Sequence, residues 1–313
     1  MITSEVIADS ISPLGKRITS LKLRYPKFIH GEFMTHRVFS RNASSSRAIP
    51  VRKLIQEVRD DNLRASPVWW GREQKGMASG DELDNKDWYT TIAGVSYSTR
   101  GAAKHEWKFA ALNAANTAER MVKMGLHKSI VNRILEPFSH INVVVTATEY
   151  DNFFGLRLDK DAQPEIRVLA ETMWRAMGES KPRKLNYGEW HLPFADDAET
   201  WDELETANVP EDQIESALIK ISVARCARTS YESFETKKRS SFGEDITLFE
   251  RLKVQAHWSP FEHPATSDTP RSESPDLDGW WHSNEWGNFK EWRQFRKMMD
   301  GEAVKPLPLE YRQ

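Results

Sequence analysis

The stretch of residues 35–47 is the part of this sequence best suited to binding phosphate. Its thirteen residues include three arginines, a histidine, an asparagine and four serines. A guanidinium group is a planar fork of donors that suits phosphate oxygens, and serine hydroxyls add neutral donors. The same residues also fit a solvated basic loop with ordinary turn serines. The composition alone favours neither interpretation.

Two further stretches, residues 152–167 and 257–263, complete a set of three motifs. The earlier one reads Asn-Phe-Phe-Gly-Leu-Arg and then, after three residues, Asp-Ala-Gln-Pro-Glu-Ile-Arg. The later one reads His-Trp-Ser-Pro-Phe-Glu-His. Together with Arg37, seven intervening residues, Ser45 and Arg47, these blocks resemble the three signature motifs of flavin-dependent thymidylate synthases. One match would be weak, but three in one chain make the resemblance strong.

The composition limits the classes of protein that fit. The chain has 313 residues with 44 Lys+Arg and 46 Asp+Glu, a formal charge of -2, so an extended nucleic acid is not an expected partner. Hydrophobic residues make up 39%, and no apolar run reaches membrane-spanning length, so we expect a soluble, cytoplasmic protein without an export signal. The single cysteine, Cys226, excludes an intramolecular disulfide and a cysteine zinc cluster, and we expect no metal site.

The elements that must position the motifs follow from the apolar patterns. Apolar and polar side chains alternate over residues 18–25, which predicts a strand with one solvent-exposed face. Residues 141–145 are mostly apolar and β-branched, which predicts a buried strand. The residues before His36 have helical spacing, so the motif leaves a helix and enters a loop. Residues 59–101 and 179–208 read as loops and connections. The other predicted helices span about 51–58, 102–124, 129–135, 161–178, 214–228 and 246–256.

We therefore expect a mixed α/β (α+β) fold, with a mixed or antiparallel sheet packed against long helices. A catalytic domain should span residues 1–264, followed by a Trp-rich C-terminal extension over 265–313, whose last aromatic residues have helical spacing. In the family that this chain resembles, the blocks found here at 227–231 and 257–263 come first. Their position at the end predicts a circular permutation, which is feasible because domain termini often lie close together.

The resemblance implies an activity, the reductive methylation of dUMP to dTMP. Methylenetetrahydrofolate supplies the carbon, NADPH the electrons, and bound FAD carries the redox chemistry. It also implies a homo-oligomer, a tetramer, in which each active site is built from several subunits. Arg133 matches an arginine donated by a neighbouring subunit. The alternative for Arg133 is an ion pair on the helix surface.

Two residues are expected to act on the reacting rings. Arg157 matches a cation beside N3 and O4 of uracil, where it would favour the N3 anion and enrich C5 in electrons. The alternative is that Arg157 only pairs with Asp159 or Asp161. His257 matches a histidine near the flavin ring that serves folate binding, and its alternative is a helix-end cap.

The resemblance also assigns binding positions along the chain. Ser45 occupies a signature position, but no histidine is placed by sequence to act as its base, so we do not expect it to be a nucleophile. The predicted cofactor-binding residues are His36, Arg37, Thr146, Thr148, Asn152, Ser230, Ser259 and Glu262. The predicted substrate-binding residues are Glu32, Ser44, Ser45, Arg47, Arg133 and Arg157.

Four positions depart from the family pattern at the junction of nucleotide and flavin. Thr35 replaces an arginine, Glu32 a glutamine, Ala43 a Glu/Gln and Ala48 a tyrosine. A carboxylate at position 32 can accept from the exocyclic amine of cytosine, which uracil lacks. Two alternatives therefore stay open. One is a flavoenzyme of the same fold that acts on another pyrimidine nucleotide such as dCMP or leaves a hydroxymethyl group, and the other is a non-catalytic nucleotide-binding protein.

Overall fold

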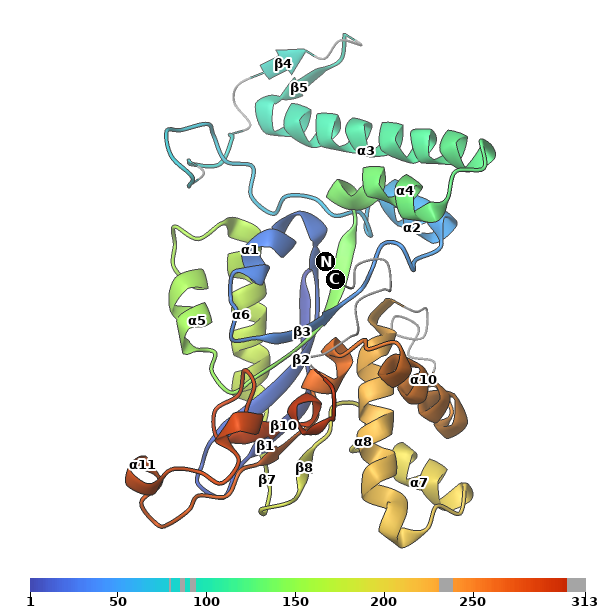
Figure 1. The fold of residues 1–313 in the computed structure, drawn as a ribbon. Helices are drawn as coiled ribbons and strands as arrows, with labels where there is room; N and C mark the ends of the chain where they lie inside the picture. The colour runs from blue at the N-terminus through green and yellow to red at the C-terminus, as the bar shows by residue number, and fades with distance from the viewer. Residues whose placement is uncertain (79, 85–87, 91–93, 231–238, 303–313) are drawn as a thin grey trace, which may run out of the picture.

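A five-stranded sheet forms the centre of the molecule (Figure 1). The structure is a computed structural model that describes residues 1–78, 80–84, 88–90, 94–230 and 239–302. The strand order is β3-β6-β2-β1-β7; the pairs are antiparallel except β1 with β7, which are parallel. The strands are β1 (Thr3–Ile11), β2 (Arg17–Pro26), β3 (Ser40–Ala43), β6 (His140–Ala147) and β7 (Arg183–Lys184).

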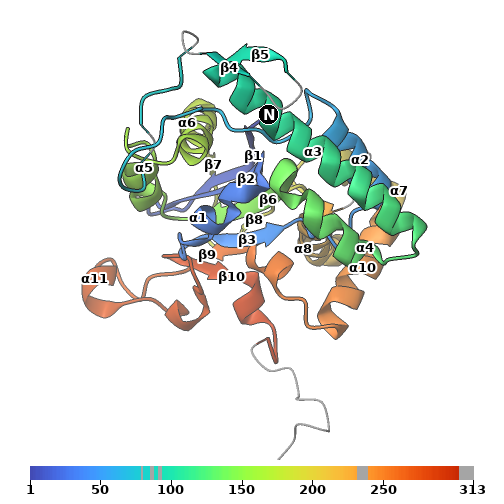
Figure 2. The same ribbon diagram turned by 90° about the horizontal axis from the view of Figure 1, so that it is seen from above.

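Strand β6 is buried on both faces, because helices cover the sheet from two sides (Figure 2). Side chains alternate across a strand, so Val143 and Val145 face the core built with α5 (Asp151–Arg157) and α6 (Pro164–Glu179). Val144 faces the other way and packs on Cys226 of α8 (Glu211–Ala227). The buried Cys226 is therefore a small core residue.

A layer of helices closes one end of the sheet, at the top of Figure 1. It contains α2 (Val51–Arg59), α3 (Thr99–Lys123), α4 (Lys128–Val131) and the 3-10 helix η2 (Asn132–Phe138). Leu54, Ala111, Ala115 and Val131 form its own small core. The layer is joined to the sheet directly, since η2 leads into β6. No helix of the described residues has both the length and the apolar character needed to cross a lipid bilayer.

The C-terminal segment packs onto the body of the protein. Its strands β9 (Ala265–Ser267) and β10 (Trp292–Gln294) form a second sheet with β8 (Trp190–His191). Trp292 is fully buried against Ile18, and Gln294 Nε2 donates to Ser40 Oγ over 3.0 Å. Residues on both sides of the predicted 264/265 boundary thus share a core, and a separate C-terminal domain stays a prediction.

The remaining elements are short or belong to the C-terminal half. They are η1 (Lys27–Ile29), α1 (His30–Met34), β4 (Trp88–Thr90), β5 (Ser96–Ser98), α7 (Ala198–Thr206), η3 (Arg228–Ser230), α10 (Phe242–Val254), η4 (Ser259–Glu262), α11 (Pro275–Asp278), η5 (Ser283–Glu285) and η6 (Phe295–Met298).

The structure confirms the mixed α/β class and the long helices, and it also shows elements that the sequence patterns did not predict. β2 and β6 are strands, and α2, α3, α6, α8 and α10 are helices, as expected. β1, α5 and α7 were not predicted. The helical spacing of the C-terminal aromatic residues was misleading. Gly287 and Glu291 both have positive φ, 59° and 64°, and these break the segment into 3-10 turns around β10.

Candidate functional site

The first and second motifs meet where α1 ends and where α5 ends. The chain leaves α1 at Thr35, and His36 then turns inward against the Phe153 ring, with ring centroids 4.9 Å apart. Arg157 is the last residue of α5. Its Nε donates to His36 Nε2 over 2.9 Å, and its Nη2 donates to Thr35 Oγ1 over 3.2 Å. Two residues of the first motif thus fix the orientation of the Arg157 guanidinium.

His36 is a neutral acceptor for Arg157. Burial, with the charges of Arg157 and Arg41 as further causes, lowers the pKa of His36 to about 4. Since Nε2 accepts the bond from Arg157, the imidazole proton lies on Nδ1. Among the described residues, Arg157 forms no ion pair with Asp159 or Asp161, so that alternative is wrong. Its positive charge faces no carboxylate partner in the described part of the chain.

The phosphate-binding candidates divide into anchored serines and open arginines. Ser44 Oγ accepts from the backbone N–H of Asn142 over 3.1 Å, and Ser46 Oγ donates to Glu136 Oε1 over 2.6 Å. Ser45 is half-buried. In contrast, Arg37 and Arg47 are exposed, and neither has a hydrogen-bond or ion-pair partner among the described residues. The serines fix the loop, and the two arginines are open to an anion.

The third motif lies beside the first, although more than two hundred residues separate them. Ser259 Oγ, on η4, donates to Asn42 Oδ1 over 3.0 Å. Asn42 Nδ2 in turn donates to the carbonyl of Cys226 over 2.8 Å and to Thr229 Oγ1 over 3.3 Å. Asn42 therefore joins β3, η4 and the end of α8. Sequence reasoning did not single out this residue, although it is the one amide in the basic stretch.

The other predicted residues of the C-terminal half have distinct placements. Glu262 pairs with Arg296 Nη1 over 2.5 Å, and this ion pair ties η4 to η6. His257 is exposed and follows Ala256, whose φ is 55°. Ser230 ends η3, and its side chain lies outside the described part of the structure, as do residues 231–238.

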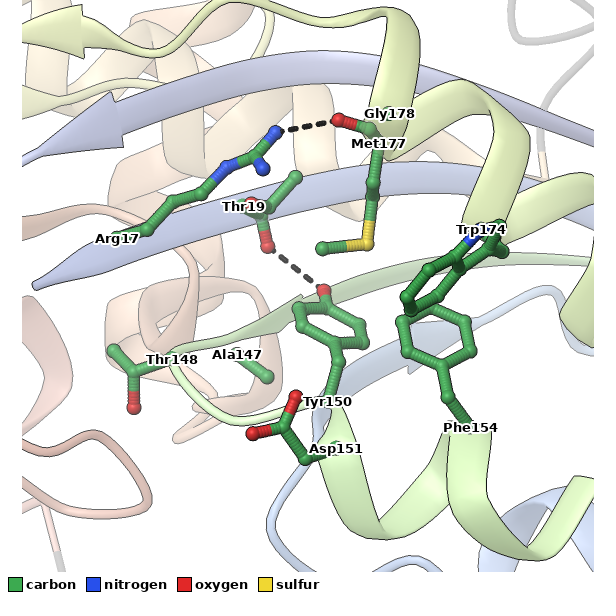
Figure 3. A pocket seen from close by; sticks show the side chains of 10 residues that line it. All are labelled: Arg17, Thr19, Ala147, Thr148, Tyr150, Asp151, Phe154, Trp174, Met177 and Gly178. Carbon is green, nitrogen blue, oxygen red and sulfur yellow. Dashed lines mark hydrogen bonds between the residues drawn. The ribbon is translucent and has the colours of Figure 1, made fainter.

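Thr146 does not present its side chain to a ligand. It is fully buried, and its hydroxyl lies 2.5 Å from Ser20 Oγ and 2.8 Å from His263 Nδ1. Because side chains alternate along β6, position 146 points into the interface with the C-terminal half. A cofactor contact by the Thr146 side chain is therefore not available in this structure. Thr148, beyond the strand end, accepts from the backbone N–H of Lys290 over 3.0 Å and lines a cavity (Figure 3).

Two predicted ligand-binding residues lie at the surface. Asn152 is exposed on α5, and Arg133 on η2 has a side chain that is 56% exposed. Arg133 Nη1 donates to Glu136 Oε1 over 2.9 Å, and the same carboxylate atom accepts from Ser46. The helix-surface ion pair that we considered for Arg133 does form. It places the guanidinium beside Ser46 of its own chain, because both side chains donate to Glu136 Oε1.

The comparisons with known proteins establish the family. The sequence profile of the thymidylate synthase complementing protein family matches residues 11–183, more than half of the chain. The chain therefore belongs to that family. The profile covers the first two motifs, and the third lies outside it. A search of curated protein sequences gave no significant match.

Solved structures similar to this chain include the UMP/dUMP methylase PolB from Streptomyces cacaoi in two forms. The form bound with 5-Br UMP is 16% identical with a TM-score of 0.40, and the match covers 57% of this chain and 89% of that chain. The form bound with 5-Br dUMP is 17% identical with a TM-score of 0.42, and the match covers 57% of this chain and 91% of that chain.

Proposed function

We propose that this protein is a flavin-dependent thymidylate synthase that methylates C5 of dUMP. The observation that carries the proposal is the placement of Arg157. Its guanidinium is oriented by neutral His36 and by Thr35, two residues of the first motif. The same motif contains the exposed Arg37 and Arg47. A fixed cation of this kind favours an anion that develops on a bound ring. Family membership supports the reaction class.

In this proposal the nucleotide phosphate binds Arg47 and the serine hydroxyls of residues 44–45. Arg157 then faces N3 and O4 of the base. A phosphate contact persists through the reaction, so Arg47 serves mainly to bind, whereas the charge on N3 develops during the reaction and Arg157 serves the chemical step. This separation of roles is experimentally accessible.

The donor set also fits a flavin dinucleotide. Arg37 offers an open guanidinium to a diphosphate, and exposed Asn152 and Ser259 offer amide and hydroxyl groups. Bound FAD supplies the transfer of electrons, which we propose come from NADPH. Exposed His257 is proposed to serve methylenetetrahydrofolate at the edge of the site. Ser230, Glu262, and the backbone near Thr146 and Thr148 complete the proposed cofactor contacts.

Glu32 favours a second candidate, the same reaction class on dCMP. Glu32 lies on α1, one turn before Thr35, and its carbonyl accepts from Thr35 Oγ1 over 2.7 Å. Thr35 Oγ1 itself accepts from Arg157, so Glu32 is part of the same cluster. Its half-buried carboxylate has no hydrogen-bond partner among the described residues, and an exocyclic amine would provide one.

Titration of the purified protein with FAD tests the flavin part of the proposal. We expect yellow protein or quenching of flavin fluorescence, with binding weakened in Arg37→Ala. The matched control is Arg72→Ala, which removes an arginine that is outside the three motifs in the sequence and is ion-paired with Asp84. A protein that neither retains flavin nor changes its fluorescence is not a flavoenzyme, and the non-catalytic nucleotide-binding alternative then stands.

A further inference from the structure

A cavity of about 300 Å³ lies next to Thr148, between the end of β6, the start of β2 and the end of α6 (Figure 3). Ala147 and Gly178 contribute little side-chain volume to its lining. Tyr150 closes part of the wall, and its hydroxyl donates to the carbonyl of Thr19 over 2.9 Å. The cavity is at the small end of the range for ligand pockets, the size of one planar ring system.

An aromatic wall forms one side of the cavity. The rings of Phe154 and Trp174 meet edge to face, with centroids 5.0 Å apart and an interplanar angle of 88°. Phe154 is buried, whereas 57% of Trp174 is exposed. An exposed indole at the mouth of a cavity provides a face on which a flat ring can stack.

Polar groups of opposite charge line the same cavity. Arg17 binds Asp9 through Nε and Nη2, over 2.8 and 2.7 Å, and Nη2 also donates to the carbonyl of Met177. Arg17 Nη1 has no hydrogen-bond partner among the described residues. Asp151 also lines the cavity and is exposed, and its carboxylate has no hydrogen-bond or ion-pair partner in the described part of the chain.

These charges decide what kind of ligand fits. Asp9 neutralises Arg17, because the pair is bidentate and the Asp9 side chain is only 4% exposed. The unpaired charge of the cavity is therefore the Asp151 carboxylate, which disfavours a phosphate. A carboxylate accepts from ring N–H and amino groups, and the spare N–H of Arg17 donates to a ring nitrogen or a carbonyl.

We propose that this cavity binds an amino-substituted heteroaromatic ring, of the purine or pterin class, stacked on Trp174 and hydrogen-bonded to Asp151. The inference rests on the proposed function only for the source of the ring. FAD carries an adenine, and methylenetetrahydrofolate carries a pterin. Both sources share the chemistry that the cavity recognises, a flat ring with an amino edge.

Calorimetric titration with three probes tests the proposal and separates the sources. The probes are FAD, FMN, which lacks adenine, and folic acid, which carries the pterin. The variants are Asp151→Asn and Trp174→Ala. Their matched controls are Asp202→Asn and Trp201→Ala, which change exposed residues of the same types on α7.

We expect Asp151→Asn to weaken either FAD or folic acid about tenfold or more, the loss typical of a hydrogen bond to a charged group. Trp174→Ala should weaken the same probe, and the controls should not. If the variants bind FAD more weakly but bind FMN with unchanged affinity, the cavity binds adenine. If they bind folic acid more weakly, the cavity binds the pterin ring. Unchanged affinities for both FAD and folic acid in Asp151→Asn would overturn the proposal. The titration needs no turnover, so a protein that shows these losses but does not methylate nucleotide contradicts only the proposed function.

Discussion

At the scale of single residues, the arrangement around Arg157 explains how the chain tolerates threonine at position 35. The family motif has an arginine at this position, whereas threonine is uncharged. Here the hydroxyl of Thr35 accepts from Arg157, and neutral His36 accepts from it as well. Both partners are uncharged, so they orient the guanidinium without neutralising the charge that the proposed reaction uses.

Replacing Arg157 should slow the chemical step more than it weakens nucleotide binding. A preorganised charge at a developing anion in a dry site is worth about 3–4 kcal/mol, roughly a hundredfold to a thousandfold in rate. Arg157→Lys should recover only part of this rate, because a point charge cannot reproduce a planar two-point contact. The measurement is single-turnover oxidation of the reduced protein at saturating nucleotide.

Arg47→Ala is the matched comparison for Arg157→Ala. Its main effect should be a higher nucleotide dissociation constant with a nearly normal rate at saturation, because phosphate is bound in ground and transition states alike. If Arg157→Ala instead bound nucleotide as weakly as Arg47→Ala and turned over normally, Arg157 would be an anchor only.

Titration of His36 gives a test that does not depend on activity. Burial and the Arg157 charge lower its pKa to about 4 in the folded protein, against about 6.5 when unfolded. The unfolded chain therefore binds the proton first, so this residue's contribution to stability is lost as pH falls from 6.5 toward 4. In NMR titrations we expect Arg157→Ala to raise the pKa of His36, with Arg37→Ala as the control. An unchanged pKa in Arg157→Ala would contradict the hydrogen bond.

At the scale of elements, a buried polar chain joins the sheet to the C-terminal half. His191 of β8 lies 2.9 Å from Ser10 Oγ and 2.8 Å from Ser20 Oγ. Ser20 contacts Thr146, which contacts His263. Burial lowers the pKa of His191 and of His263 to about 3, so both are neutral at physiological pH.

Because this buried polar network contains two neutral histidines, we expect acid to destabilise the whole fold. Both histidines take up protons at about pH 6.5 when unfolded but only near pH 3 when folded, so stability falls as pH drops through this window. At pH 5 each should cost about 2 kcal/mol of the free energy of unfolding. Urea denaturation of His191→Gln should show a shallower loss between pH 7 and pH 5 than the unmodified protein. Equal slopes would contradict the buried neutral state of His191.

Local patterns predicted some elements well and others not at all. The alternation of β2 and the continuous apolar run of β6 identified both strands. β1 was not predicted, because its register shifts between Val6 and Ala8 and this breaks the alternation of apolar and polar residues. α5 escaped because it has seven residues, too few for a periodic stripe. Motif spacing predicted roles for Arg157 and Asn152, and these roles stay predictions. The orientation of Thr146 and the bridging position of Asn42 depend on which strand face meets α8 and η4, which local patterns do not encode.

At the scale of the whole molecule, the first motif contacts each of the other two, although the three are dispersed along the chain. β3 and η4 are in contact, and Asn42 connects them to the end of α8. We propose that this is the consequence of a circular permutation, in which the same packing is reached with a different order of segments.

Subunit mixing tests whether the proposed tetramer shares its active sites. We expect a mixture of Arg47→Ala and Arg133→Ala subunits to recover activity that neither variant has alone, because some sites then contain both arginines. The competing interpretation is that Arg133 serves the site of its own chain, because it contacts Glu136 within that chain. No recovery, together with an active monomer in sedimentation, would show that Arg133 serves its own chain.

The most direct test of the central claim is the mass of the nucleotide product. Purified protein is incubated with FAD, NADPH, methylenetetrahydrofolate and dUMP, and in parallel with dCMP, and the nucleotides are weighed by mass spectrometry. The proposed function predicts dUMP heavier by one methylene group, with the product lost when any of the three co-reactants is omitted. A methylated product from dCMP alone would transfer the assignment to the cytosine nucleotide that Glu32 favours. Unchanged masses of both nucleotides, in protein shown to bind FAD, would contradict the assignment of this chain as a flavin-dependent nucleotide methylase.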